Sequence, residues 1–110
     1  MSDLKKVAPR DVKLAERFLP YADQLPESAR TVLADIILTG YLPADTMGVR
    51  VSIREKSAQL KNKKLSSYCA DGDLSPYHRA LVYFLYHLAG KKSFNWRGRA
   101  VACLNRYEKK

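Results

Sequence analysis

The apolar positions of this chain repeat mainly with the period of an α-helix, and the clearest repeat covers residues 74–89. Its apolar residues fall on one helix face; they are Tyr77, Ala80, Leu81, Phe84, Leu85 and Leu88. Ser75 and Pro76 are residue types favoured where a helix begins, and Gly90 is typical of the turn that ends one. This pattern predicts one central helix that the remaining helices cover.

Other helices are predicted on both sides of the central one. A short helix at residues 11–19 is ended by Pro20, and residues 26–39 carry a continuous apolar stripe that Gly40 ends. A last helix, capped by Ser93, extends to about residue 107. The first ten residues show no period and are predicted to be a flexible lead-in.

The segment before the central helix has a mixed pattern. Val49, Val51 and Ile53 alternate with polar residues, as in a strand, but no second strand is predicted to pair with them. We expect an extended loop, followed by a helix that begins at the capping box of Ser52 and Glu55 and extends to about residue 68. A β-ribbon shared with a second copy of the chain is the alternative.

Together these elements predict an all-α fold: a compact single domain, residues 1–110, of about five helices. The net charge is +9, and it is unevenly placed. Residues 1–49 contain six Lys or Arg and seven Asp or Glu, whereas residues 50–110 contain fourteen and four. Positive charge confined to one half of a chain indicates a polyanionic partner, and nucleic acid is the first candidate.

The predicted third helix is strongly basic. Its cations are Arg54, Lys56, Lys61, Lys63 and Lys64. Glu55 is the single acid among them, so like charges repel unless a partner such as a phosphate backbone neutralises them. A solvated surface helix is the alternative interpretation.

The central and last helices, joined by a short turn, have the outline of a helix-turn-helix. The side chains expected to contact nucleic acid there are Lys91, Lys92, Asn95, Arg97, Arg99 and Arg106. In this arrangement Lys91 and Lys92 contact phosphates, while Asn95 and Arg99 reach base edges in the major groove. Helix pairs with short glycine turns also occur in helical proteins that bind no DNA.

A second face of the central helix carries Arg79, Tyr83, Tyr86 and His87. Aromatic rings beside cations suit a protein interface or stacking on unpaired bases. A plain surface whose polar tips reach water is the alternative. If the face is covered by protein, a homodimer would supply the cover.

Catalytic and metal-binding patterns are scarce. The spacings of Cys69, His78, His87 and Cys103 match no zinc motif, and no cofactor is expected. Two cysteines and no signal-peptide pattern favour a reducing cytoplasm, and no apolar run reaches the ~20 residues of a membrane span.

We therefore expect a non-catalytic nucleic-acid-binding protein, with DNA favoured over RNA, that acts as a regulator or accessory factor. One alternative is a protein-binding inhibitor or adaptor that uses its basic and aromatic surface. The other is a small RNase that uses His78 or His87 with nearby arginines.

Overall fold

The computed structural model describes residues 5–43, 46–60, 74–90 and 94–109, and helices dominate this part of the chain. The helices are α1 (Pro9–Glu16), the 3₁₀ helix η1 (Leu19–Gln24), α2 (Glu27–Thr39), α3 (Met47–Leu60), α4 (Pro76–Leu88) and α5 (Trp96–Glu108). Two short strands, β1 (Lys5–Lys6) and β2 (Tyr41–Leu42), form an antiparallel pair. The Cα radius of gyration is 13.2 Å, close to the value of about 13 Å expected for a compact domain of this length. The predicted all-α, compact fold is confirmed.

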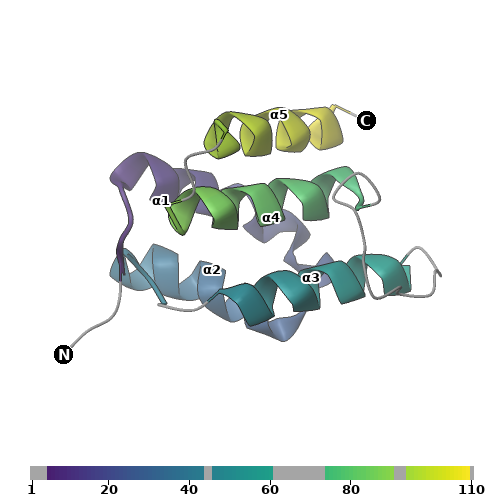
Figure 1. The fold of residues 1–110 in the computed structure, drawn as a ribbon, viewed down its shortest axis with the longest axis horizontal. Coiled ribbons are helices and arrows are strands. Elements are labelled where there is room, and N and C mark those ends of the chain that lie inside the picture. The colour runs from purple at the N-terminus through teal and green to yellow at the C-terminus, as the bar shows by residue number, and fades with distance from the viewer. Residues whose placement is uncertain (1–4, 44–45, 61–73, 91–93, 110) are drawn as a thin grey trace.

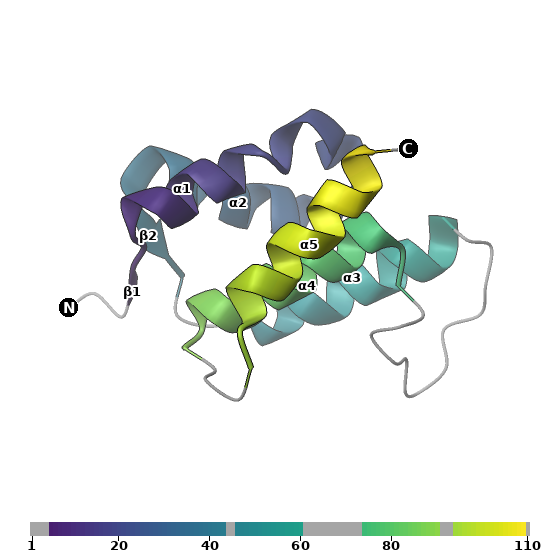
Figure 2. The ribbon, with the colours of Figure 1, turned by 90° about the horizontal axis from the view of Figure 1, so that it is seen from above.

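The helices are arranged around α4, as the sequence predicts. Figure 1 shows α4 between α5 on one side and α2 and α3 on the other. The last helix, α5, runs back along α4 in the opposite direction, and Figure 2 shows α1 beside α5 at the same side of the molecule. The three helices α1, α4 and α5 therefore meet, although α1 is more than 70 residues before α5 in the sequence.

The core is built on the predicted apolar face of α4, all of whose residues are buried. Phe18 lies against this face, with its ring 5.6 Å from the ring of Phe84 and 5.7 Å from that of Tyr77. The hydroxyl of Tyr77 donates a hydrogen bond of 2.6 Å to the carbonyl oxygen of Phe18. Burial raises the pKa of Tyr77 well above its ordinary value of 10.0, so the hydroxyl stays protonated and keeps this bond.

The predicted ends of α4 are also confirmed. The Ser75 hydroxyl caps the helix by accepting from the backbone N–H of His78 at 3.4 Å, and Gly90 adopts the left-handed φ of 88° that follows a helix end. Ser75 and the Nδ1 of His78 are also hydrogen-bonded, while Nε2 of His78 lies 2.9 Å from the carbonyl oxygen of Gln24. His78 is 1% exposed, and both of its ring nitrogens are used inside the fold.

Replacing Ser75 with alanine is expected to destabilise the protein by about 2 kcal/mol, because it removes a helix cap and the hydrogen bond to the buried Nδ1 of His78. Chemical denaturation followed by circular dichroism measures this loss. Ser52→Ala is the matched control. Ser52 lies inside α3 and caps no helix, so its replacement is expected to change stability by less than about 0.5 kcal/mol.

The prediction for residues 49–53 is wrong. These residues are helical: α3 begins at Met47, and the carbonyl oxygen of Thr46 accepts from the backbone N–H of Arg50 at 3.0 Å. Ile53 and Ser57 are buried one turn apart, whereas Val51 is 50% exposed. The inward face of α3 therefore includes a serine, which breaks the apolar period of a helix. The alternation of Val49, Val51 and Ile53 with polar residues then matched the pattern of a strand. Neither a loop nor a shared β-ribbon forms at these residues.

Residues 5–10 belong to defined elements, where the sequence predicted a flexible lead-in over residues 1–10; residues 1–4 lie outside the described residues. Lys5–Lys6 pairs with Tyr41–Leu42, Val7 is 5% exposed, and α1 begins at Pro9. Beyond α1, the 3₁₀ helix η1 occupies most of the stretch between the two helices predicted at residues 11–19 and 26–39. The strand pair is only two residues long, and no sequence period marks so short an element.

Candidate nucleic-acid interface

A group of aromatic rings in tilted and edge-to-face contact lies where the start of α5 meets α4. The ring of Trp96 is 5.3 Å from Tyr83, 5.0 Å from Tyr86 and 5.3 Å from Phe94. Tyr83 and Tyr86 belong to the second face of α4, for which a protein interface, base stacking and a plain surface were the predicted alternatives. Trp96 supplies cover for both rings from within the same chain.

Arginines from two distant segments gather on these rings. The guanidinium of Arg50 lies 5.0 Å from the ring centre of Tyr86, and Nη2 of Arg54 donates to the hydroxyl of Tyr86 at 3.1 Å. At the other end, the guanidinium of Arg99 lies 4.8 Å from the ring centre of Phe94. We call this group the arginine–aromatic cluster; its members are Arg50, Arg54, Tyr83, Tyr86, Phe94, Trp96 and Arg99.

The cluster combines two kinds of contact that nucleic acids use. A guanidinium stacked on a ring is held in place, so less side-chain entropy is lost when its N–H edge binds a phosphate or a base. Phe94 is 55% exposed, and Arg99 is exposed beside it. This end of the cluster can accept both a stacked base and a negative charge.

The N-terminus of α5 adds positive potential at the same place. No acidic residue lies in the first turn of α5, and Arg97 and Arg99 are both within it. Cations are unfavourable near the positive end of a helix dipole and become favourable when an anion binds between them. The indole Nε1 of Trp96 is buried without a hydrogen-bond partner in the part of the chain that the structure describes.

Asn95 has a structural role that the sequence analysis assigned to Ser93. Its side-chain oxygen accepts from the backbone N–H of Gly98 at 3.0 Å and caps α5. Gly98 suits this cap, because a Cβ there would lie 2.6 Å from Nδ2 of Asn95. The base-reading role predicted for Asn95 stays a prediction.

The remaining predicted residues are dispersed. Lys56 is half-buried on α3, Arg106 is exposed near the far end of α5, and Nη2 of Arg79 donates to the carbonyl oxygen of Leu74 at 3.1 Å. Five predicted cations lie outside the described residues: Lys61, Lys63, Lys64, Lys91 and Lys92.

Arg97 and His87 are joined by Asp11, a residue that was not among the predicted site residues. Asp11 on α1 is 5% exposed, and its two carboxylate oxygens accept from Nε2 of His87 and from Nε of Arg97, both at 2.9 Å. These contacts connect α1, α4 and α5 through one buried carboxylate. A single Asp in a short helix carries no sequence pattern that indicates this role.

The described residues contain no group of three His, Cys, Asp or Glu side chains that could hold a metal ion. Cys103 is a buried free thiol, and Cys69 lies outside the described residues. No helix in the described part of the chain is long and apolar enough to cross a membrane.

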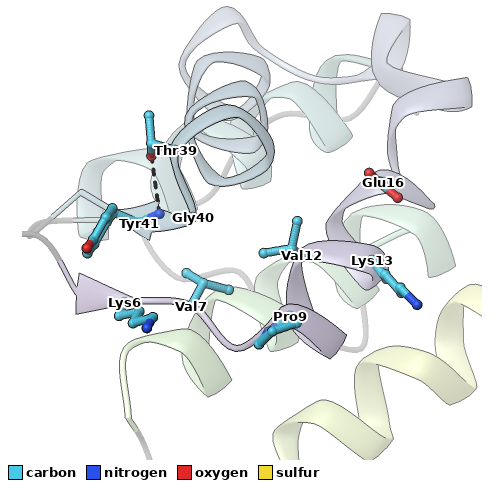
Figure 3. Close-up of a pocket in the computed structure, with 9 residues that line it drawn as sticks. All are labelled: Lys6, Val7, Pro9, Val12, Lys13, Glu16, Thr39, Gly40 and Tyr41. Atoms are coloured by element: carbon cyan, nitrogen blue, oxygen red, sulfur yellow. Dashed lines mark hydrogen bonds between the residues drawn. The ribbon is translucent and has the colours of Figure 1, made fainter.

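A hollow of about 530 Å³ lies beside β1 and the start of α1 (Figure 3). It is lined by Lys6, Val7, Pro9, Val12, Lys13, Glu16, Thr39, Gly40 and Tyr41. Its largely apolar lining offers no convergent set of hydrogen-bonding groups, and the hydroxyl of Thr39 already accepts from the backbone N–H of Tyr41 at 3.2 Å. We assign no chemistry to this hollow.

Comparison of the chain with protein-family models, with curated proteins and with solved structures found no match. The fold and the side-chain geometry are therefore the basis for the functional conclusion.

Proposed function

We propose that this protein binds nucleic acid without catalysing a reaction on it, through the arginine–aromatic cluster. The observation that carries the proposal is the guanidinium of Arg99 over the ring of Phe94, a residue that is 55% exposed and lies beside the ring of Trp96. The ring offers a base-stacking surface, and the guanidinium offers a fixed positive charge at its edge.

The two α3 arginines support the same proposal. Arg50 and Arg54 are one helical turn apart, and both contact Tyr86, whose ring also contacts Trp96. Cations from α3 and α5 are therefore linked through shared rings rather than scattered over the surface. Such a linked set suits a polyanion that contacts several cations at once.

The finer proposal, helix-turn-helix docking of α5 in a major groove, predicts base reading by Arg99. Figure 1 shows α4 and α5 running side by side in opposite directions, whereas the two helices of a helix-turn-helix cross at roughly 90–120°. We therefore favour phosphate contact and stacking over base reading. We propose DNA as the ligand to be tested first. We also propose the reducing cytoplasm that the sequence predicts as the location of the protein.

Replacing Arg99 with glutamine is expected to weaken nucleic-acid binding by about three- to tenfold at low salt, because it removes a phosphate contact and its charge. The measurement is a titration of labelled duplex DNA, single-stranded DNA and RNA at several salt concentrations. The slope of log affinity against log salt is expected to become shallower by about 0.9 for duplex DNA and about 0.7 for a single strand.

Arg30→Gln is the matched control, because Arg30 is an exposed arginine on α2 and its replacement removes the same charge. It is expected to change affinity less than twofold. Equal losses for Arg99→Gln and Arg30→Gln would assign the effect to net charge alone, and an absence of binding near 50 mM salt would exclude the proposed function. If Arg99→Gln weakens one DNA sequence much more than others, the helix-turn-helix alternative is favoured.

The other function classes lead to different results. A protein-binding adaptor predicts no nucleic-acid binding. The RNase alternative now depends on His87, because His78 is enclosed and both of its ring nitrogens are bonded. It predicts cleavage of bound RNA that His87→Ala abolishes.

A homodimer is also a proposal, and light scattering tests it. The main argument for a homodimer was that Tyr83 and Tyr86 need a cover, and Trp96 supplies that cover within one chain.

A further inference from the structure

A second basic feature lies between α5 and α1. It is a hollow of about 340 Å³, at the lower end of the range for ligand pockets. Its lining residues are Arg10, Lys13, Leu14, Arg17, Arg97 and Val101. Four of these six side chains are cationic and none is a carboxylate, so the hollow is a basic groove with two apolar residues in its wall.

Two of the four cations, Arg97 and Arg17, are held in place by hydrogen bonds to side chains outside the lining of the groove. Nε of Arg97 donates to the buried carboxylate of Asp11 at 2.9 Å, and Nη2 of Arg17 donates to Asn105 at 2.7 Å and to Glu108 at 2.6 Å. Each guanidinium uses one nitrogen in these bonds. The other nitrogens have no recorded partner among the described residues and remain able to donate to a ligand.

The other two cations are not neutralised. In the described part of the chain, no ion pair is recorded for Arg10 or Lys13, and both are exposed. Figure 3 shows Lys13 pointing away from Val12, toward the side where α5 lies, while the carboxylate of Glu16 points elsewhere. Arg10, Lys13 and Arg17, the residue that follows α1, are three and four residues apart, so three like charges share one helix face.

We propose that this groove is a phosphate-binding site. The charge-assisted N–H donors of Arg17 and Arg97 are fixed, and Arg10 and Lys13 supply the charge that an anion neutralises. The phosphate could belong to a nucleic-acid backbone or to a free polyphosphate. The first source rests on the proposed function, and it requires one strand to contact both Arg99 and Arg97, which lie two residues apart in the first turn of α5.

The groove itself is tested with inorganic pyrophosphate, titrated into the labelled 110-residue chain at low salt and followed by NMR. We expect the resonances of Arg10, Lys13 and Arg97 to shift together, and Lys13→Gln to weaken binding about three- to tenfold. Arg30→Gln removes the same charge outside the groove and is expected to leave the affinity within twofold. Shifts that avoid these residues, or equal losses for the two variants, would overturn the proposal. Both substitutions are at exposed positions, and unchanged thermal melts confirm that the variants fold.

A salt titration with DNA and RNA distinguishes the two sources of phosphate. If a nucleic-acid backbone enters the groove, Lys13→Gln makes the salt slope shallower by about one phosphate contact, and Arg30→Gln does not. If pyrophosphate binds in the groove but the nucleic-acid slopes of the two variants are equal, the site takes free phosphate compounds. If no nucleic acid binds at all, the proposed function is wrong. The pyrophosphate titration still shows whether the groove binds phosphate.

Discussion

Replacing Phe84 with alanine is expected to lower the free energy of unfolding by about 4 kcal/mol, because it opens a cavity at the centre of the fold. Phe84 is fully buried on α4, and its ring is stacked on Phe18 with an interplanar angle of 19°. Domains of this size are stable by about 5–15 kcal/mol, so the loss is a large part of the total. Urea denaturation followed by circular dichroism measures it, and the melting temperature is expected to fall by about 15 °C.

Two further variants keep this prediction testable. Phe84→Leu fills most of the cavity and is expected to lose about 1.5 kcal/mol, so it remains measurable if the alanine variant does not fold. Phe94→Ala removes the same ring from a 55% exposed position and is expected to lose less than about 1 kcal/mol. Similar losses at Phe84 and Phe94 would mean that the stacked ring on α4 does not anchor the core.

The central helix was predictable because its residues satisfy several local rules at once. The apolar period, the cap at Ser75 and the left-handed Gly90 all mark the same segment, and the structure places each as expected. The start of α3 was not predictable in this way. The inward face of α3 uses Ser57, which is 1% exposed, so hydrophobic periodicity alone could not show that residues 49–53 continue a helix.

The residues of the two proposed binding surfaces were also only partly predictable from the sequence. The excess of positive charge in residues 50–110 predicted that the binding residues lie in that half of the chain. Three cations of the groove, Arg10, Lys13 and Arg17, instead come from residues 1–49, where the charges nearly cancel. Their spacing on α1 was visible in the sequence, but the closeness of α1 to α5 is a tertiary contact across more than 70 residues. The same is true of Arg54 and Tyr86, which were predicted for two different surfaces and form one hydrogen bond.

Replacing Asp11 with alanine is expected to lower the free energy of unfolding by about 2–3 kcal/mol. The buried carboxylate joins α1 to α4 through His87 and to α5 through Arg97, and its removal leaves both donors without an acceptor. Removing one partner of a fully buried pair costs 3–5 kcal/mol. The side chains of His87 and Arg97 are 27% and 32% exposed, so water replaces part of what is lost and the expected value is lower.

Glu108→Gln provides the matched control, since it removes a carboxylate from an ion pair that also connects α5 to the N-terminal half. The Arg17–Glu108 pair is more open, with side chains 36% and 32% exposed, and its loss is expected to cost no more than about 1 kcal/mol. Asp11→Asn keeps one acceptor oxygen and is expected to fall between the two. Urea denaturation ranks the three variants. A loss for Asp11→Ala no greater than that for Glu108→Gln would mean that apolar packing alone holds α1 against α4 and α5, and that Asp11 does not fix Arg97 at the edge of the groove.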